Sequence, residues 1–137
     1  MSMASFFTPR MFLIVGGAVL LILGLAGFAF LSSASAYPSF YLDSGENVAH
    51  TGLGIIALAA VYVPGLNGAL RPYYRWIVIL VGSISLFFAV YGLVVSGNAS
   101  PNTFGVANLE NPFDNVLHFV VAAWAYWSAR SSEPMTA

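Results

Sequence analysis

The chain has no cysteine and few charged residues, four basic and five acidic among 137. The lack of cysteine excludes disulfides, thiolate metal sites, iron–sulfur clusters and cysteine nucleophiles. A soluble domain carries about 25 % charged residues, whereas this chain has 7 %, too few to cover a water-exposed surface. Four basic residues also provide no positive field for nucleic acid, so we expect no nucleic-acid partner.

Motifs that bind phosphate or present a serine nucleophile are missing as well. No G-x-x-x-x-G-K, G-x-G-x-x-G or G-x-S-x-G pattern occurs in the sequence, so nothing resembles a phosphate cradle or a nucleophile elbow. No acidic or basic side chain lies in the middle of an apolar run, which argues against a proton pump or a transporter. We therefore expect a protein that is not an enzyme.

Apolar residues dominate what is present, with 59 % hydrophobic residues, 15 % aromatic residues and a mean hydropathy of +0.84. Four apolar runs cover residues 11–31, 47–63, 73–96 and 113–129. About 20 apolar residues span the hydrocarbon core as a helix, and the runs lack the period-2 alternation of barrel strands. The sequence predicts an all-α membrane protein, with residues 1–137 forming one domain of four transmembrane helices.

The charged residues predict the orientation of these helices. The basic residues flank the ends that would share one side of the membrane: Arg10, Arg71, Arg75 and Arg130. Four acids fall at the opposite ends, and the fifth lies in the tail: Asp43, Glu46, Glu110 and Asp114, then Glu133. Because basic residues favour the cytoplasmic side, we expect both termini in the cytoplasm and loops 32–45 and 97–112 outside.

An internal repeat relates the two halves of the chain. Residues 46–50 (Glu-Asn-Val-Ala-His) and 114–118 (Asp-Asn-Val-Leu-His) share the pattern acid-Asn-Val-x-His at an offset of 68. The same offset relates Asp43 to Asn111 and Gly24 to Gly92. The simplest explanation is a duplicated helical hairpin, which predicts an up-down bundle with a pseudo-two-fold axis along the membrane normal.

The acids of the repeat have the spacing of helix caps. Asp43 precedes Glu46 by three residues, and Asn111 precedes Asp114 by three. This is the spacing of a capping box, and Pro112 would then occupy the first helical position, where a missing N–H costs nothing. Capping alone explains the acids without any ligand.

The two histidines have no such simple explanation. His50 and His118 each follow an acid by four residues, and ionisable groups in a membrane helix are functional candidates. One interpretation is an interhelical hydrogen bond to Asn47, Asn115, Thr51 or a facing carboxylate. A second is a divalent-metal site held by both histidines with Glu46 and Asp114. A third is axial ligation of a haem or chlorin by both histidines.

Small residues recur on three of the runs and predict close packing of helices within one bundle. They are Gly17, Gly24, Gly27, Ser85, Ala89, Gly92, Ser96, Ala122, Ala125 and Ala129.

The repeat also carries a resemblance to a known family. The steps Asn47-Val48-Ala49-His50 and Asn111-Pro112-Phe113-Asp114-Asn115-Val116-Leu117-His118, with the aromatic and glycine-rich run between them, resemble a family of uncharacterised four-span bacterial membrane proteins, a domain of unknown function. The similarity covers residues 11–130. It implies the four-helix fold and a prokaryotic origin, and it supplies no activity. The expected location is therefore the bacterial cytoplasmic membrane.

Together these features predict a small non-catalytic membrane protein. Its expected partners are the lipid bilayer and either other membrane-protein subunits, in which it is an accessory or packing subunit, or further copies of itself. The alternative is a ligand-binding module that holds a metal ion, a haem or a chlorin through His50 and His118 near the outer face.

Overall fold

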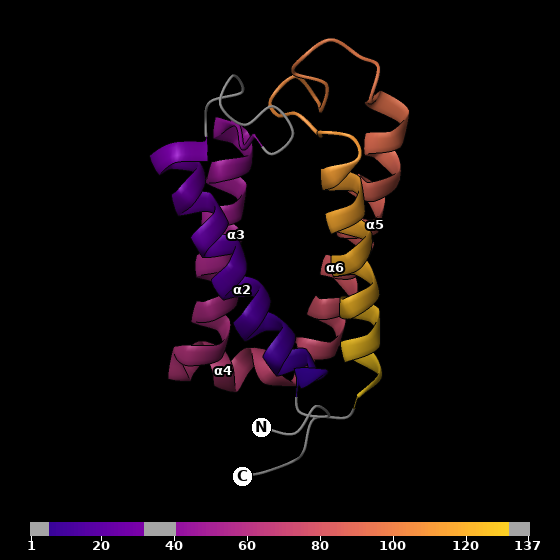
Figure 1. The fold of residues 1–137 in the computed structure, drawn as a ribbon. Helices are drawn as coiled ribbons and strands as arrows, with labels where there is room; N and C mark the ends of the chain where they lie inside the picture. Colours follow the sequence, from indigo (N-terminus) through magenta and orange to yellow (C-terminus); the bar gives the residue numbers. More distant parts are fainter. Residues whose placement is uncertain (1–5, 32–40, 132–137) are drawn as a thin grey trace.

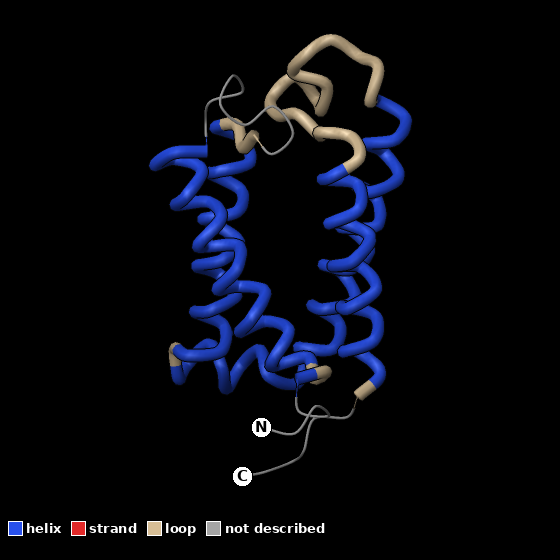
Figure 2. The backbone as a smooth tube through the Cα atoms, in the orientation of Figure 1, coloured by secondary structure: helices blue, strands red, loops and turns tan. Residues whose placement is uncertain are grey.

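The structure, a computed structural model, describes residues 6–31 and 41–131. Most of the predicted outer loop 32–45 and the tail acid Glu133 lie outside these residues. Four long helices dominate the described residues: α2 (Pro9–Ala26), α3 (Ser44–Tyr62), α5 (Tyr74–Val95) and α6 (Phe113–Arg130). The predicted all-α fold is confirmed, since the described part of the chain contains no strand (Figure 2).

Shorter helical pieces connect or extend the four helices. A π-helix, η1 (Gly27–Leu31), extends α2, and α4 (Pro64–Leu70) with the 3-10 turn η2 (Arg71–Tyr73) joins α3 to α5. Figure 1 shows α4 running across the foot of the molecule, between the ends of α3 and α5. Val63, the residue before a proline, is extended and ends α3, because proline disfavours helical backbone at the position before it.

The helices pack as two hairpins, α2 along α3 and α5 along α6 (Figure 1). Small residues allow each pair to approach closely. A Cβ at Gly54 of α3 would lie 2.8 Å from the carbonyl oxygen of Gly17 in α2. A Cβ at Gly82 of α5 would lie 2.8 Å from the Cβ of Ala125 in α6. The predicted small-residue packing therefore occurs inside each hairpin, with the exception of Ser96, whose side chain is exposed.

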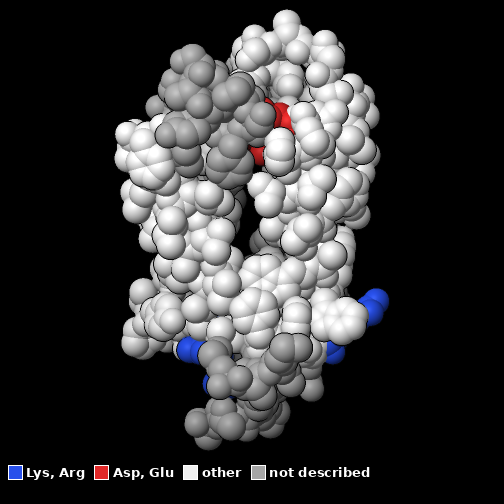
Figure 3. Space-filling view, viewed as in Figure 1, with Lys and Arg blue, Asp and Glu red and all other residues white. Residues whose placement is uncertain are grey.

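The two hairpins meet in a core near the foot of the molecule. Its buried members come from α2, α3, α5 and α6: Phe12, Leu13, Val61, Tyr74, Val78, Ala125 and Ala129. The Phe12 and Trp124 rings cross between the hairpins with centroids 4.5 Å apart. Above this core a gap separates the hairpins in the space-filling view (Figure 3). The hairpins are thus joined at the foot and stand apart over their middle.

Large apolar side chains are exposed on all four long helices. Ile22 and Ile56 are each 66 % exposed, and Leu80 and Val120 are each 60 % exposed. Two described stretches, Pro9–Phe30 and Pro64–Val95, are long and apolar enough to cross a membrane. The polar repeats at the starts of α3 and α6 lower the hydropathy of those two helices. An apolar surface of this extent is unusual for a protein in water.

The basic and the acidic described residues lie at opposite ends of the molecule, as the sequence predicts. Figure 3 shows arginines around the foot and acids near the top, between the two hairpins.

Candidate functional site

The first repeat begins with the predicted capping box. The Asp43 side chain accepts a hydrogen bond from the Glu46 backbone N–H at 3.0 Å, and the Glu46 carboxylate accepts one from the Asp43 backbone N–H at 2.9 Å. Asp43 is the N-cap of α3. These reciprocal bonds satisfy two backbone donors at the start of the helix, so this part of the prediction is confirmed.

The second repeat begins differently, and the predicted cap at Asn111 is wrong. The N-cap of α6 is Pro112, which has no capping side chain, so proline does not occupy the first helical position. The Asn111 side chain instead accepts from the Asn115 side-chain amide at 3.0 Å. The Asp114 carboxylate reaches four residues back, to the Glu110 backbone N–H at 2.7 Å. In both repeats the acid therefore secures the segment that precedes its helix.

Three carboxylates from the two hairpins come together at the top of the molecule. Glu46 of α3 meets Glu110 and Asp114 of the second hairpin, with one ligand oxygen from each lying within 4.8 Å of the others. We call these three residues the acid cluster. Figure 3 shows acidic side chains at this end of the molecule, between the hairpins. Glu110 was not among the predicted site residues; the sequence signal that points to it is its position four residues before Asp114.

A direct hydrogen bond also ties the hairpins together beside the acid cluster. The Asp43 carboxylate accepts from the Asn108 backbone N–H at 2.6 Å. Asn108 belongs to the loop between α5 and α6, so the capping residue of the first hairpin holds the loop of the second. The same loop lies against Gly45, where a Cβ would be 2.5 Å from the Val106 carbonyl oxygen. The hairpins are therefore connected at both ends.

The environment of the acid cluster favours the neutral form of two carboxyls that lie outside the predicted spans. Burial raises the pKa of Glu46 to about 9, and the charges of Asp114, Asp43 and Glu110 act in the same direction. Burial also raises the pKa of Glu110 to about 8, followed by the effect of the neighbouring Asp114 carboxyl. Three carboxylates this close repel one another, so a proton or a cation is needed to neutralise the cluster.

The histidines lie one helical turn further along α3 and α6. The His118 Nδ1 is 2.7 Å from the carbonyl oxygen of Asp114, so Nδ1–H donates to its own helix and Nε2 is left available. The His118 ring also lies against Phe88, with centroids 5.8 Å apart. The His50 Nδ1 is buried and has no hydrogen-bond partner among the described residues. His50 is near enough to His118 and Asp114 to interact with both electrostatically.

The structure corrects two of the predicted roles of these histidines. In the part of the chain that is described, His118 bonds within α6 and the His50 Nδ1 has no partner, so neither histidine makes the predicted interhelical hydrogen bond. The carboxylates that converge are Glu46, Glu110 and Asp114, and neither histidine belongs to that group. The predicted four-ligand set is therefore replaced by three carboxylates, with the imidazoles beneath them.

The two repeated asparagines have matching environments inside their hairpins. Asn47 is 1 % exposed and Asn115 is 2 % exposed. A Cβ at Gly27 would overlap the Asn47 Oδ1, and a Cβ at Gly92 would overlap the Asn115 Oδ1. Neither Oδ1 accepts an N–H or O–H hydrogen bond from the described residues. A glycine Cα–H directed at such an oxygen forms a weak hydrogen bond, so these asparagines hold helices together rather than face a ligand.

Comparison of the chain with protein-family models, with curated proteins and with solved structures finds no match.

Proposed function

We propose that this chain is an integral membrane protein with four transmembrane helices and no catalytic activity, and that it acts as an accessory or packing subunit of a membrane assembly or associates with itself. The observation that carries the proposal is the exposure of large apolar side chains on all four long helices. Such a surface is stable against lipid tails or apolar helices and unstable in water. The duplicated hairpin is part of the same proposal.

The distribution of charge supports a membrane orientation for this bundle. All four arginines lie at the foot and four acids lie at the top or in the adjoining loop. Basic residues near helix ends favour the cytoplasmic side, so the termini and α4 would face the cytoplasm. The loop between α5 and α6 and the acid cluster would lie outside.

Two matched cysteine variants test the four-span topology, because the natural chain has no cysteine to interfere. Ala69 in α4 and Ala99 in the outer loop are both exposed alanines at opposite ends of the molecule. In intact cells, a membrane-impermeant maleimide should label Ala99→Cys. It should label Ala69→Cys only after permeabilisation. Labelling of both variants in intact cells, or recovery of the chain in the soluble fraction, would overturn the topology.

The gap between the hairpins supports a packing role. In the described residues the halves of the bundle touch near their ends, which leaves apolar helix faces available to other helices. Association in membranes depends on such close packing rather than on the hydrophobic effect. Sedimentation in a mild detergent and single-molecule photobleaching in nanodiscs would measure self-association. A strictly monomeric chain whose expression has no effect on any membrane complex would contradict the proposed role.

A second candidate function is cation binding at the outer end, and the acid cluster is the observation that favours it. Oxygen atoms of Glu46, Glu110 and Asp114 lie within 4.8 Å of one another, and carboxylate oxygens suit divalent cations. The imidazoles of His50 and His118 lie one helical turn further along α3 and α6 and do not belong to that group. These imidazoles are also the candidates for a haem or chlorin.

Titration with Zn²⁺ and Mg²⁺ in a calorimeter tests the cation site. Binding with a 1:1 stoichiometry that Glu46→Gln abolishes would support it, and Glu133→Gln in the tail is the matched charge control. Visible absorption of the purified protein tests a haem or chlorin, and the signal should disappear in the double variant His50→Ala/His118→Ala. If neither a heat of metal binding nor visible absorption is observed, the second candidate function is wrong and the packing role is unaffected.

A further inference from the structure

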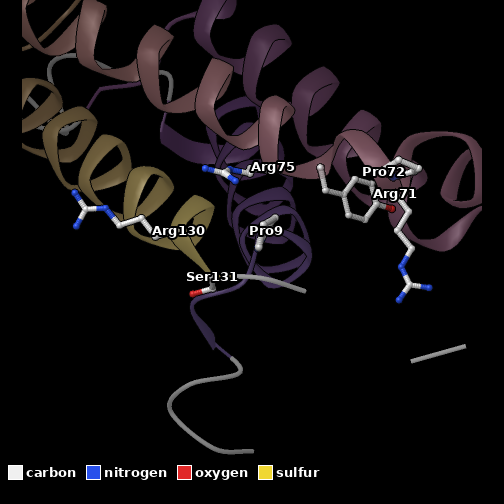
Figure 4. Close-up of a pocket in the computed structure, with 7 residues that line it drawn as sticks. Pro9, Arg71, Pro72, Arg75, Arg130 and Ser131 are labelled. Carbon is white, nitrogen blue, oxygen red and sulfur yellow. The ribbon is translucent and has the colours of Figure 1, made fainter. Parts of the chain in front are cut away.

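A pocket of about 230 Å³ lies at the foot of the molecule, away from the acid cluster. Three of the four arginines line it, namely Arg71, Arg75 and Arg130. Figure 4 shows Pro9 between them, with Arg75 and Arg130 on one side and Arg71 on the other. The pocket is formed where the start of α2, the start of α5 and the end of α6 meet.

The described lining of this pocket is basic. None of the described residues that line it is acidic, and the acid cluster is at the opposite end of the molecule. The side chains of Arg75 and Arg130 are exposed, so their charges are accessible to a ligand. A planar guanidinium pairs with phosphate oxygens in a bidentate manner. The chemistry of the pocket is therefore that of a phosphate site.

The start of α5 adds to the same preference for an anion. Arg75 is the second residue of this 22-residue helix, its N-cap makes no side-chain hydrogen bond, and its first turn contains no acid. The N-terminal end of a helix carries a partial positive charge and favours an anion, and an arginine there is the reverse of the usual arrangement. An anion between Arg75 and Arg130 would be stabilised by both guanidinium groups and by the helix end.

The level of the pocket relative to the apolar helices indicates which anion it receives. The apolar stretch Pro9–Phe30 begins at the pocket, and the stretch Pro64–Val95 contains its lining residues Arg71 and Arg75. Trp76, which is 65 % exposed, lies beside Arg75 with the guanidinium carbon 5.9 Å from its ring centroid. Tryptophan and arginine at this position are typical of the membrane–water interface, and basic pockets between helices on the cytoplasmic side bind anionic headgroups.

We propose that the pocket lined by Arg71, Arg75 and Arg130 binds the phosphate of an anionic phospholipid headgroup in the cytoplasmic leaflet. This inference rests on the proposed membrane insertion. The acyl chains of the bound lipid would extend along the apolar helices, so the site requires a lipid and not phosphate alone.

The test uses the full chain purified in a neutral detergent and titrated with short-chain phosphatidylglycerol, with Trp76 fluorescence as the reporter. Phosphatidylcholine with the same chains is the control for the headgroup charge, and inorganic phosphate is the control for the lipid tails. We expect saturable binding of phosphatidylglycerol. Arg75→Gln and Arg130→Gln should each weaken it about fivefold and together about 30-fold. Arg10→Gln removes the same charge at the same end outside the pocket lining, and it should change the affinity by less than about twofold.

Three results would overturn the proposal. Equal binding of phosphatidylcholine would show that the headgroup charge is not recognised. Binding of inorganic phosphate as tight as that of the lipid would assign the pocket to free phosphate. An equal loss of affinity for phosphatidylglycerol in Arg10→Gln and Arg75→Gln would show a diffuse charge effect rather than a site. A failure of membrane insertion is detected separately by the cysteine labelling of Ala69→Cys and Ala99→Cys, so the two failures are distinguishable.

Discussion

Replacing Gly92 with alanine tests the contact between glycine and asparagine that the two repeats share. Gly92 lies in the interior of α5, where alanine has the better helix propensity by about 1 kcal/mol. On propensity alone, Gly92→Ala would stabilise the chain. The added Cβ would overlap the Asn115 Oδ1, and Asn115 is 2 % exposed, so its side chain has little room to move.

The expected sign follows from the size of the opposing terms. Overpacking a tight contact costs about 1–3 kcal/mol. Rotation of Asn115 away from the new methyl group would also break its 3.0 Å hydrogen bond to Asn111, at a cost of about 1 kcal/mol. Against a gain of about 1 kcal/mol from propensity, the net effect is a loss of about 1–3 kcal/mol in the free energy of unfolding.

The assay is reversible unfolding of the purified protein in mixed micelles, with two comparisons. Gly52→Ala is the matched control, because Gly52 lies in the interior of α3 and a Cβ there meets no atom within 4 Å; it should be neutral or stabilising. Gly27→Ala should behave as Gly92→Ala does, since it faces Asn47. If Gly92→Ala is as stable as Gly52→Ala, the close contact with Asn115 is wrong.

Three further predictions concern the ends of the hairpins. The pKa values of Glu46 and Glu110 are raised from 4.5 to about 9 and about 8, so the folded chain holds more protons than the unfolded chain between these values. The free energy of unfolding should therefore fall as the pH rises from about 5 to about 9. In thermal unfolding, Glu46→Gln should flatten this dependence on pH, and an unchanged dependence would contradict the prediction. Tyr74→Phe should cost about 1–2 kcal/mol, because its buried hydroxyl donates to a carbonyl oxygen of α3 at 2.7 Å, whereas Tyr73→Phe at an exposed position should be neutral in the same assay. Asp43→Ala should lower stability by about 1–3 kcal/mol, since it removes both a helix cap and the hydrogen bond to the loop between α5 and α6; a loss below about 0.5 kcal/mol would show that this loop is not held by Asp43.

The positions of the helices along the chain could be predicted from the apolar runs. Run 47–63 corresponds to α3, and run 113–129 corresponds to α6 within one residue. Pro64 and Gly65, which follow run 47–63, explain why α3 ends there, because proline restricts the residue before it. They do not predict α4, which begins at that same proline. A proline is compatible with the first turn of a new helix, so the pattern alone cannot separate a turn from a helix start.

The candidate site could be predicted only in part, because it depends on how the hairpins meet. Local spacing was sufficient for the capping box of Asp43 and Glu46, whose atoms belong to one helix start. The equivalent prediction for Asn111 failed since its side chain bonds Asn115 instead. The inclusion of Glu110 in the acid cluster depends on the long loop before α6, whose path the sequence does not specify.

The position of α4 has a mechanical consequence for the molecule. It is the covalent connection between the hairpins, and it lies at the arginine end. At the other end, among the described residues, the Asp43 carboxylate bonds the Asn108 backbone, Gly45 lies against Val106, and the acid cluster brings carboxyls of both halves close together. Ionisation of those carboxyls would therefore let the outer tips swing apart about a hinge at α4, while every helix keeps its own backbone hydrogen bonds.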